Sequence, residues 1–210
     1  VVAQAPQEQP QVSRSSLVRT HKARMNYWWD FCPRLVHQGI WDEVYLEASG
    51  YAMLEDVYVR PVFKQNLEQV EVRVACRVNS TAAGKGQIEV KLSLGGETVA
   101  SSSTTSTIPE GESQHNLTIP LILPKLWWPN GMGEQVLYQA DVTLRIAKVE
   151  KLILNDQRVV KFGVRSAVAV PNKGAPQDAL PYTLEVNGKR MYAKGWNWVP
   201  MDALYGVERE

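Results

Sequence analysis

Tryptophans beside polar residues are the part of this sequence with the clearest chemical potential. All seven tryptophans lie in three short clusters, and each cluster also holds an aspartate or an asparagine. A flat indole ring can stack on the C–H face of a sugar while a neighbouring carboxylate or amide binds a hydroxyl. The clusters therefore favour contact with a carbohydrate, against the simpler interpretation that tryptophans fill a core. They occupy residues 27–33 with 39–41, 126–131, and 194–200.

The composition is that of a globular protein with a nearly neutral surface. Hydrophobic residues make up 44% and charged residues 21% of the 210 residues, which is ordinary for a folded domain. A net charge of +1 gives no electrostatic basis for binding nucleic acid or a membrane surface. Cys32 and Cys76 form no disulfide framework and lack the spacing of metal ligands. We therefore expect no metal, no cofactor, no nucleic-acid partner and no membrane partner, and the lack of disulfides favours a cytoplasmic location.

Alternation of apolar and polar residues, the pattern typical of β-strands, dominates the middle of the chain. Residues 79–86, rich in Asn, Ser, Thr, Ala and Gly, predict a hairpin loop. The predicted strands are 57–59, 70–78, 88–94, 97–99, 116–123, 136–146 and 158–164. About seven short strands separated by turn residues predict an all-β fold, an immunoglobulin-like sandwich of two antiparallel sheets.

Both flanks of this region look incomplete by themselves. Residues 36–47 predict a turn followed by a strand, with too little before it to close a domain. After Pro171, residues 182–186 and 190–194 alternate on either side of Asn187-Gly188, a dipeptide typical of β-hairpins. We therefore expect each flank to belong to a neighbouring domain.

The three clusters, in this order and at these separations, make the chain resemble glycoside hydrolase family 2, and within it the β-mannosidases. The resemblance runs from about Lys22 to Tyr205. The segments that carry it are Trp29-Asp30-Phe31-Cys32-Pro33, Gly39-Ile40-Trp41, Leu126-Trp127-Trp128-Pro129-Asn130-Gly131, Phe162-Gly163-Val164-Arg165 and residues 186–200. Phe31-Cys32 stands where the family usually has Trp-Gly, and this departure bears on substrate detail.

The resemblance implies three domains and places the chemistry outside the chain. Residues 1–53 would be the C-terminal part of a jelly-roll sugar-binding domain, 54–167 the immunoglobulin-like sandwich, and 168–210 a linker with the first hairpin of a TIM barrel. Members of the family catalyse retaining hydrolysis with two glutamates on later barrel strands. We therefore expect a fragment without catalytic residues, which does not hydrolyse glycosides alone.

The resemblance also assigns part of a sugar-binding shell to four residues. Trp29 and Asp30 match the loop with which family members contact the terminal sugar. Asn197 and Trp198 match the end of a first barrel strand, on the face where such barrels build their sites. The expected partners are a terminal β-mannoside or a related sugar, and the rest of the chain's own barrel.

Alternatives remain open at this stage. The substrate could instead be a β-galactoside, β-glucuronide or β-glucosaminide, because sugar choice depends largely on barrel loops. The chain could also be a standalone immunoglobulin-like carbohydrate-binding or adhesion module, although residues 194–200 have no use in a self-contained sandwich. We expect Trp127 and Trp128 to pack the sandwich against its neighbours, and Arg165 to meet a carboxylate at a domain junction.

Overall fold

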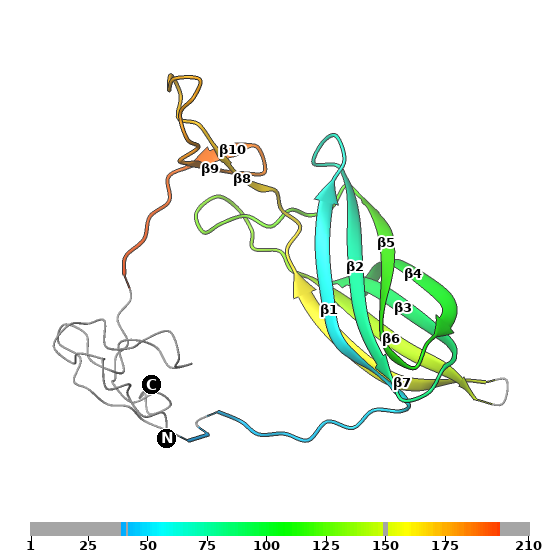
Figure 1. Ribbon diagram of the computed structural model, residues 1–210. Coiled ribbons are helices and arrows are strands. Elements are labelled where there is room, and N and C mark those ends of the chain that lie inside the picture. Colours follow the sequence, from blue (N-terminus) through cyan, green and yellow to red (C-terminus); the bar gives the residue numbers. More distant parts are fainter. Residues whose placement is uncertain (1–38, 41, 149–150, 198–210) are drawn as a thin grey trace. The chain divides into compact units, whose positions relative to one another are not determined.

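The computed structural model describes residues 39–40, 42–148 and 151–197, and these form β-strands, turns and loops (Figure 1). Contacts divide the chain into two compact units. One unit is Ala48–Lys194, and the other comprises Val1–Glu47 with Gly195–Glu210. No helix in the described part of the chain is long and apolar enough to cross a membrane.

Seven strands of the unit Ala48–Lys194 form two antiparallel sheets with a common core. The first sheet has the order β1-β2-β5, and the second has the order β4-β3-β6-β7 (Figure 1). The strands of the first sheet are β1 (Ala52–Phe63), β2 (Gln69–Ser80) and β5 (Gly111–Ile122). Those of the second are β3 (Gly84–Leu94), β4 (Glu97–Ile108), β6 (Tyr138–Lys148) and β7 (Lys151–Phe162). The predicted all-β sandwich is therefore confirmed.

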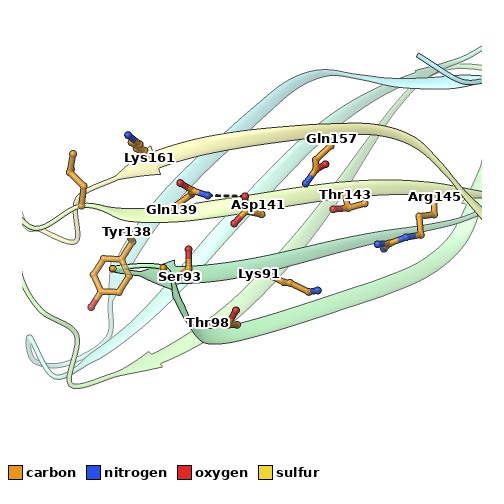
Figure 2. Close-up of a pocket in the computed structure, with 13 residues that line it drawn as sticks. Lys91, Ser93, Thr98, Tyr138, Gln139, Asp141, Thr143, Arg145, Gln157 and Lys161 are labelled. Carbon is orange, nitrogen blue, oxygen red and sulfur yellow. Dashed lines mark hydrogen bonds between the residues drawn. The ribbon is translucent and has the colours of Figure 1, made fainter. Parts of the chain in front are cut away.

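The core lies between the two sheets because successive side chains of a strand point to opposite faces. In β2 every second side chain from Val70 to Val78 is buried, and β6 does the same from Ala140 to Ile146. The other face of the second sheet is polar, with side chains such as Gln139, Asp141 and Arg145 directed away from the core (Figure 2). Apolar and polar residues alternate regularly in the sequence because one face of the sheet packs on the core and the other faces solvent.

Three local predictions differ from the structure. The strand predicted at 97–99 is present but extends to Ile108 as β4, whose run of Ser and Thr pairs with β3 along its length. The loop predicted at 79–86 is only 81–83, since Gly86 lies inside β3, where an added Cβ would come within 2.5 Å of Ile108 Cγ1. Residues 42–47, where the sequence predicts a strand, form none.

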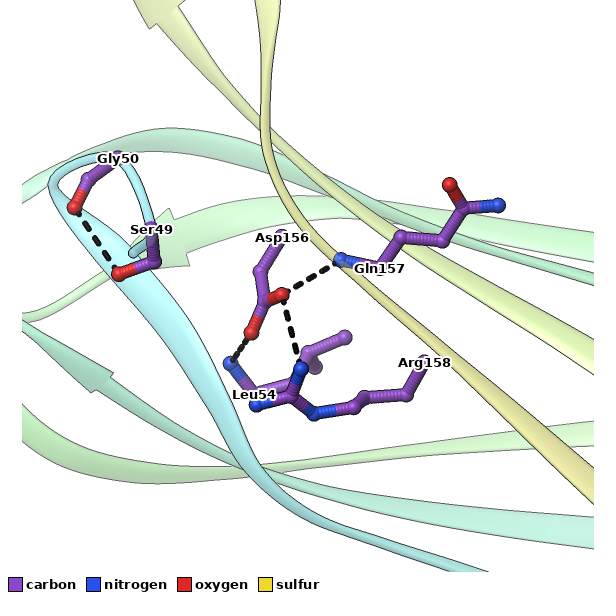
Figure 3. A network of polar contacts seen from close by, with 6 residues as sticks. All are labelled: Ser49, Gly50, Leu54, Asp156, Gln157 and Arg158. Atoms are coloured by element: carbon purple, nitrogen blue, oxygen red, sulfur yellow. Dashed lines mark hydrogen bonds and ion pairs between the residues drawn. The ribbon is translucent and has the colours of Figure 1, made fainter. Parts of the chain in front are cut away.

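At one margin of the sandwich, side chains of β7 bind the backbone of β1. Asn155 Oδ1 accepts a hydrogen bond from the backbone N–H of Ala52 at 3.2 Å, and Asp156 Oδ2 accepts one from Leu54 at 2.7 Å. The backbone carbonyl of Asn155 accepts a third from Gly50 at 2.9 Å. Asp156 Oδ1 also accepts from the backbone N–H of Gln157 and pairs with Arg158 (Figure 3). Side chains thus satisfy N–H groups of β1, and they tie the two sheets together.

A third, smaller sheet follows the sandwich. It has the order β10-β9-β8, with β8 at Ala167–Val170, β9 at Thr183–Val186 and β10 at Lys189–Met191. Asn187 and Gly188, between β9 and β10, have φ angles of +49° and +75°. Two residues with positive φ in a two-residue hairpin loop are typical of a type I′ turn, so the predicted hairpin is confirmed.

Candidate functional site

The four residues predicted to bind sugar are not brought together in the described part of the chain. Trp29, Asp30 and Trp198 lie outside the described residues. Asn197 is described, and its side chain is exposed in a segment without regular structure. The convergence of these four side chains on one sugar stays a prediction.

The second tryptophan cluster lies in residues 124–135, which form most of the connection between β5 and β6 and are called the tryptophan loop below. Trp127 pairs with Gln135 in an isolated antiparallel bridge, and the Trp128 N–H donates to the Glu134 carbonyl at 2.9 Å. A turn closes the loop between them, where the Met132 N–H donates to the Pro129 carbonyl at 3.0 Å. The loop is therefore an ordered arm with its own hydrogen bonds.

Both indole rings of this loop pack against other residues of the described chain. An added Cβ on Gly163 would come within 2.9 Å of Trp127, so only glycine allows this approach. The Arg165 guanidinium lies 4.6 Å from the centre of the Trp127 ring, and Lys189 Nζ lies 4.8 Å from that of Trp128. Such cation–π contacts are attractive. Each ring therefore has a cation of the chain itself over its face.

The expected carboxylate partner of Arg165 is not found among the described residues. Its guanidinium contacts the Trp127 ring instead, just beyond the end of β7. Arginine stacks readily on aromatic faces because its planar cation is weakly hydrated. The sequence pattern showed a cation at the junction but not which neighbour it would meet.

Asn187 is the residue of this region whose role the sequence interpretation missed. Its side-chain Nδ2 donates to the Trp127 carbonyl at 3.0 Å, and its Oδ1 accepts from the Ser166 N–H at 2.9 Å. Its own N–H donates to the Ser166 carbonyl at 3.0 Å. With an exposed fraction of 4%, Asn187 is buried although it lies in a turn. The Asn-Gly pair already explained the turn, so no sequence signal pointed to these tertiary bonds.

An open hollow of about 700 Å³ lies beside the tryptophan loop, between its turn at 129–132 and residues 190–194. Its cations are Arg190 and Lys194. Arg190 is held in place because its Nη1 donates to the Pro171 carbonyl at 2.7 Å. The exposed ring of Tyr192 also borders the hollow. These groups can meet a polar or acidic surface, but they include no acid–base pair.

The polar face of the second sheet forms another shallow hollow, of about 550 Å³ (Figure 2). Beside it, Glu89 accepts a hydrogen bond from Arg145 at 2.8 Å and pairs with Lys91 at 3.5 Å. The hydrogen bond from Arg145 is the main cause that lowers the pKa of Glu89. Asp141 accepts from the Gln139 amide at 2.9 Å. Carboxylates engaged in this way are typical of a solvated sheet face rather than of general acid–base catalysis.

The other perturbed groups of the described chain also have structural causes. Hydrogen bonds from Lys64 and then Arg73 lower the pKa of Glu71. Burial raises the pKa of the Cys76 thiol to about 11, so it is protonated and unreactive at neutral pH. Burial lowers the pKa of His115, whose Nε2 lies 3.0 Å from Ser113 Oγ. In the described residues no group of three or more His, Cys, Asp or Glu side chains is placed to bind a metal.

Fold and site together define a class of protein: an immunoglobulin-like sandwich that carries a tryptophan loop and, bound to it, a small three-stranded sheet. Residues 52–165 match the family described as glycosyl hydrolases family 2. This match covers the whole sandwich and more than half of the chain. The chain belongs to glycosyl hydrolases family 2.

The chain is also similar to individual glycosidases over much of its length. A β-mannosidase B of Neosartorya fischeri is 29% identical over 191 residues, which are 90% of this chain and 21% of that protein. The crystal structure of a β-D-mannosidase from Dictyoglomus thermophilum superposes with a TM-score of 0.75 at 28% identity, over 90% of this chain and 22% of that one. An exo-chitosanase of Amycolatopsis orientalis has a TM-score of 0.53 at 25% identity, over 72% of this chain and 17% of its own. The chain thus spans about a fifth of the length of the relatives that it matches.

Proposed function

We propose that this chain is the sandwich-bearing part of a β-mannosidase-like glycosidase, which hydrolyses terminal β-linked sugars with retention in its full length. The main support is the similarity to the Dictyoglomus thermophilum β-D-mannosidase over 90% of the chain. A match of that extent reaches beyond the unit Ala48–Lys194 into the flanks. Those flanks carry the residues expected to contact sugar, whereas the exo-chitosanase matches less of the chain. This difference favours a mannoside over a glucosaminide.

The proposed layout has three parts. Residues 1–53 end a jelly-roll sugar-binding domain, 54–167 form the sandwich, and 168–210 lead into the first hairpin of a TIM barrel. In this layout the sandwich is a spacer that fixes two sugar-contacting segments, and the polar outer face of its second sheet is solvated. The two catalytic carboxylates belong to the barrel, where a retaining enzyme needs them about 5 Å apart.

The contribution of this chain to catalysis is then the recognition of the terminal sugar. Trp29 and Trp198 supply rings that stack on the pyranose, while Asp30 and Asn197 bind its hydroxyls. A charge-assisted hydrogen bond from a sugar hydroxyl to Asp30 is the strongest single contact in this set. Such contacts orient the sugar so that the barrel carboxylates can act on its anomeric carbon.

The test is hydrolysis of 4-nitrophenyl glycosides by the full-length protein, with the β-mannoside compared with the β-galactoside, β-glucuronide and β-glucosaminide. We expect the β-mannoside to have the highest kcat/KM. Asp30→Ala should lower that kcat/KM about tenfold or more, the effect of one lost charge-assisted hydrogen bond. Asp42→Ala is the matched control, because Asp42 is exposed and bonds the backbone of its neighbour Glu43.

Two controls separate this proposal from its alternatives. Trp128→Ala should lower stability and leave KM unchanged, because the ring packs against Gly133 and Lys189. The chain 1–210 alone should hydrolyse none of the glycosides. Turnover by that chain after repurification would refute the layout, and a full-length protein that binds sugar without hydrolysing any glycoside would favour a carbohydrate-binding module.

A further inference from the structure

Asn187 joins three segments that are far apart in the sequence. It lies in the turn between β9 and β10, and its side chain bonds the tryptophan loop at the Trp127 carbonyl and the end of the sandwich at the Ser166 N–H. Its backbone N–H adds a third bond to the Ser166 carbonyl. No other side chain of the described residues bonds both of these segments.

The turn alone does not require asparagine at this position. With φ at +49°, glycine would fit the backbone at least as well. The side chain is nevertheless buried, and both its donor and its acceptor are used. A buried amide whose two ends are satisfied by different segments fixes those segments in a single arrangement.

The hairpin that Asn187 holds is too short to fix its own direction. β9 has four residues and β10 has three, and hairpins of this size are marginal without tertiary support. β9 also pairs with β8 along residues 183–186, which joins the hairpin to the strand that follows the sandwich. Towards the tryptophan loop and Pro171, the other side-chain contacts of the hairpin come from the exposed residues Lys189 and Arg190 and contribute little. The amide of Asn187 is the buried side chain that bonds the hairpin to the tryptophan loop.

We propose that Asn187 is a positioning residue: it locks the β9–β10 hairpin onto the tryptophan loop and thereby fixes the course of the chain through β10, upstream of the predicted sugar-contacting residues Asn197 and Trp198. This inference rests on the proposed function, because it matters for catalysis only if those two residues contact the sugar. Asn187 itself does not touch substrate. Its loss should weaken sugar binding while the chemistry of the bound sugar is spared.

The test compares Asn187→Gly with Leu123→Gly in the full-length protein. Leu123 is a matched control because it is also a non-glycine residue at φ +50°, but its side chain is 71% exposed. Both changes relieve the same backbone strain, and only Asn187→Gly removes the two hydrogen bonds of a buried side chain. The first readout is hydrogen exchange at the Ser166 N–H, with the amides of β6 as an internal measure of folding. We expect protection at Ser166 to fall about tenfold or more in Asn187→Gly and to stay unchanged in Leu123→Gly.

The second readout is kinetics on the 4-nitrophenyl β-mannoside, well below the unfolding temperature. In Asn187→Gly we expect KM to rise about fivefold or more with kcat within about twofold of wild type. Unchanged protection at the Ser166 N–H would show that Asn187 does not hold the β9–β10 hairpin in place. Reduced protection with an unchanged KM would overturn the positioning role and leave a purely structural one. A wild-type protein that hydrolyses no glycoside would instead refute the proposed function and the kinetic part of this inference, while the exchange at Ser166 would still decide whether Asn187 holds the hairpin.

Discussion

The interior of the sandwich and its two margins are held together in different ways. The interior is a continuous cluster of buried aliphatic side chains from both sheets, including Leu54, Ile119 and Leu144. Each margin depends on one buried asparagine, Asn155 between β1 and β7 and Asn187 between the tryptophan loop and the β9–β10 hairpin.

Apolar burial and directed hydrogen bonds have different effects on this fold. Burial supplies most of the stability, because it is proportional to the apolar area removed from water. The hydrogen bonds of the asparagines each contribute less, but they specify which segments meet. The stability of the sandwich and the orientation of its margins are therefore separate properties, and different substitutions should affect them.

The largest expected effect is in the interior. Leu144→Ala should lower the free energy of unfolding by about 2–5 kcal/mol, since it removes three carbon atoms from a fully buried site and leaves a cavity. Urea denaturation measures this loss. Leu137→Ala, at a leucine that is 51% exposed, is the control and should cost much less. Equal losses at the two positions would mean that the interior does not dominate stability.

An intermediate effect is expected at the margin between β1 and β7. Asn155→Ala removes the acceptor for the buried Ala52 N–H and should cost about 1–3 kcal/mol. Hydrogen exchange should show the Ala52 amide opening before the amides of β6, because the change is local. Asn116→Ala, on the exposed side of β5, is the matched control. Equal protection of the Ala52 amide in both variants would show that the backbone alone holds this margin.

The smallest effect is expected on the polar face, where Glu89 meets Arg145 and Lys91. Because the pKa of Glu89 is lowered from its ordinary value of 4.5, the ionised form is favoured by folding. The resulting stability is present above pH 4.5 and is lost as the pH falls through the lowered pKa of the folded state. Glu89→Gln should therefore cost about 0.5 kcal/mol or less at pH 7, since the pair is partly exposed to solvent.

Chemical denaturation at several pH values checks the prediction for Glu89. The difference in unfolding free energy between wild type and Glu89→Gln should shrink as the pH falls below 4.5. Glu97→Gln, at an exposed glutamate of β4, is the matched control. A loss at Glu89 as large as that at Leu144 would contradict the view that the outer face is merely solvated.

The sequence determined the sandwich and the hairpin turn. Alternation at 70–78 predicts a strand because period-2 burial is a local property of a strand with one dry face. Asn187-Gly188 predicts the turn because positive φ at both positions is intrinsic to those residues. The same local logic failed for β4, where Ser and Thr line both faces of an edge strand and leave no contrast.

Only the tertiary structure decided how the margins close. Asn155 meets Ala52, and Asn187 meets Trp127, across long stretches of chain. Arg165 finds the Trp127 ring rather than a carboxylate for the same reason. The sequence shows that an asparagine or arginine can form such contacts, but it does not show which residue will be the partner. The partner depends on which segments the fold brings together, and the burial of apolar side chains drives that folding.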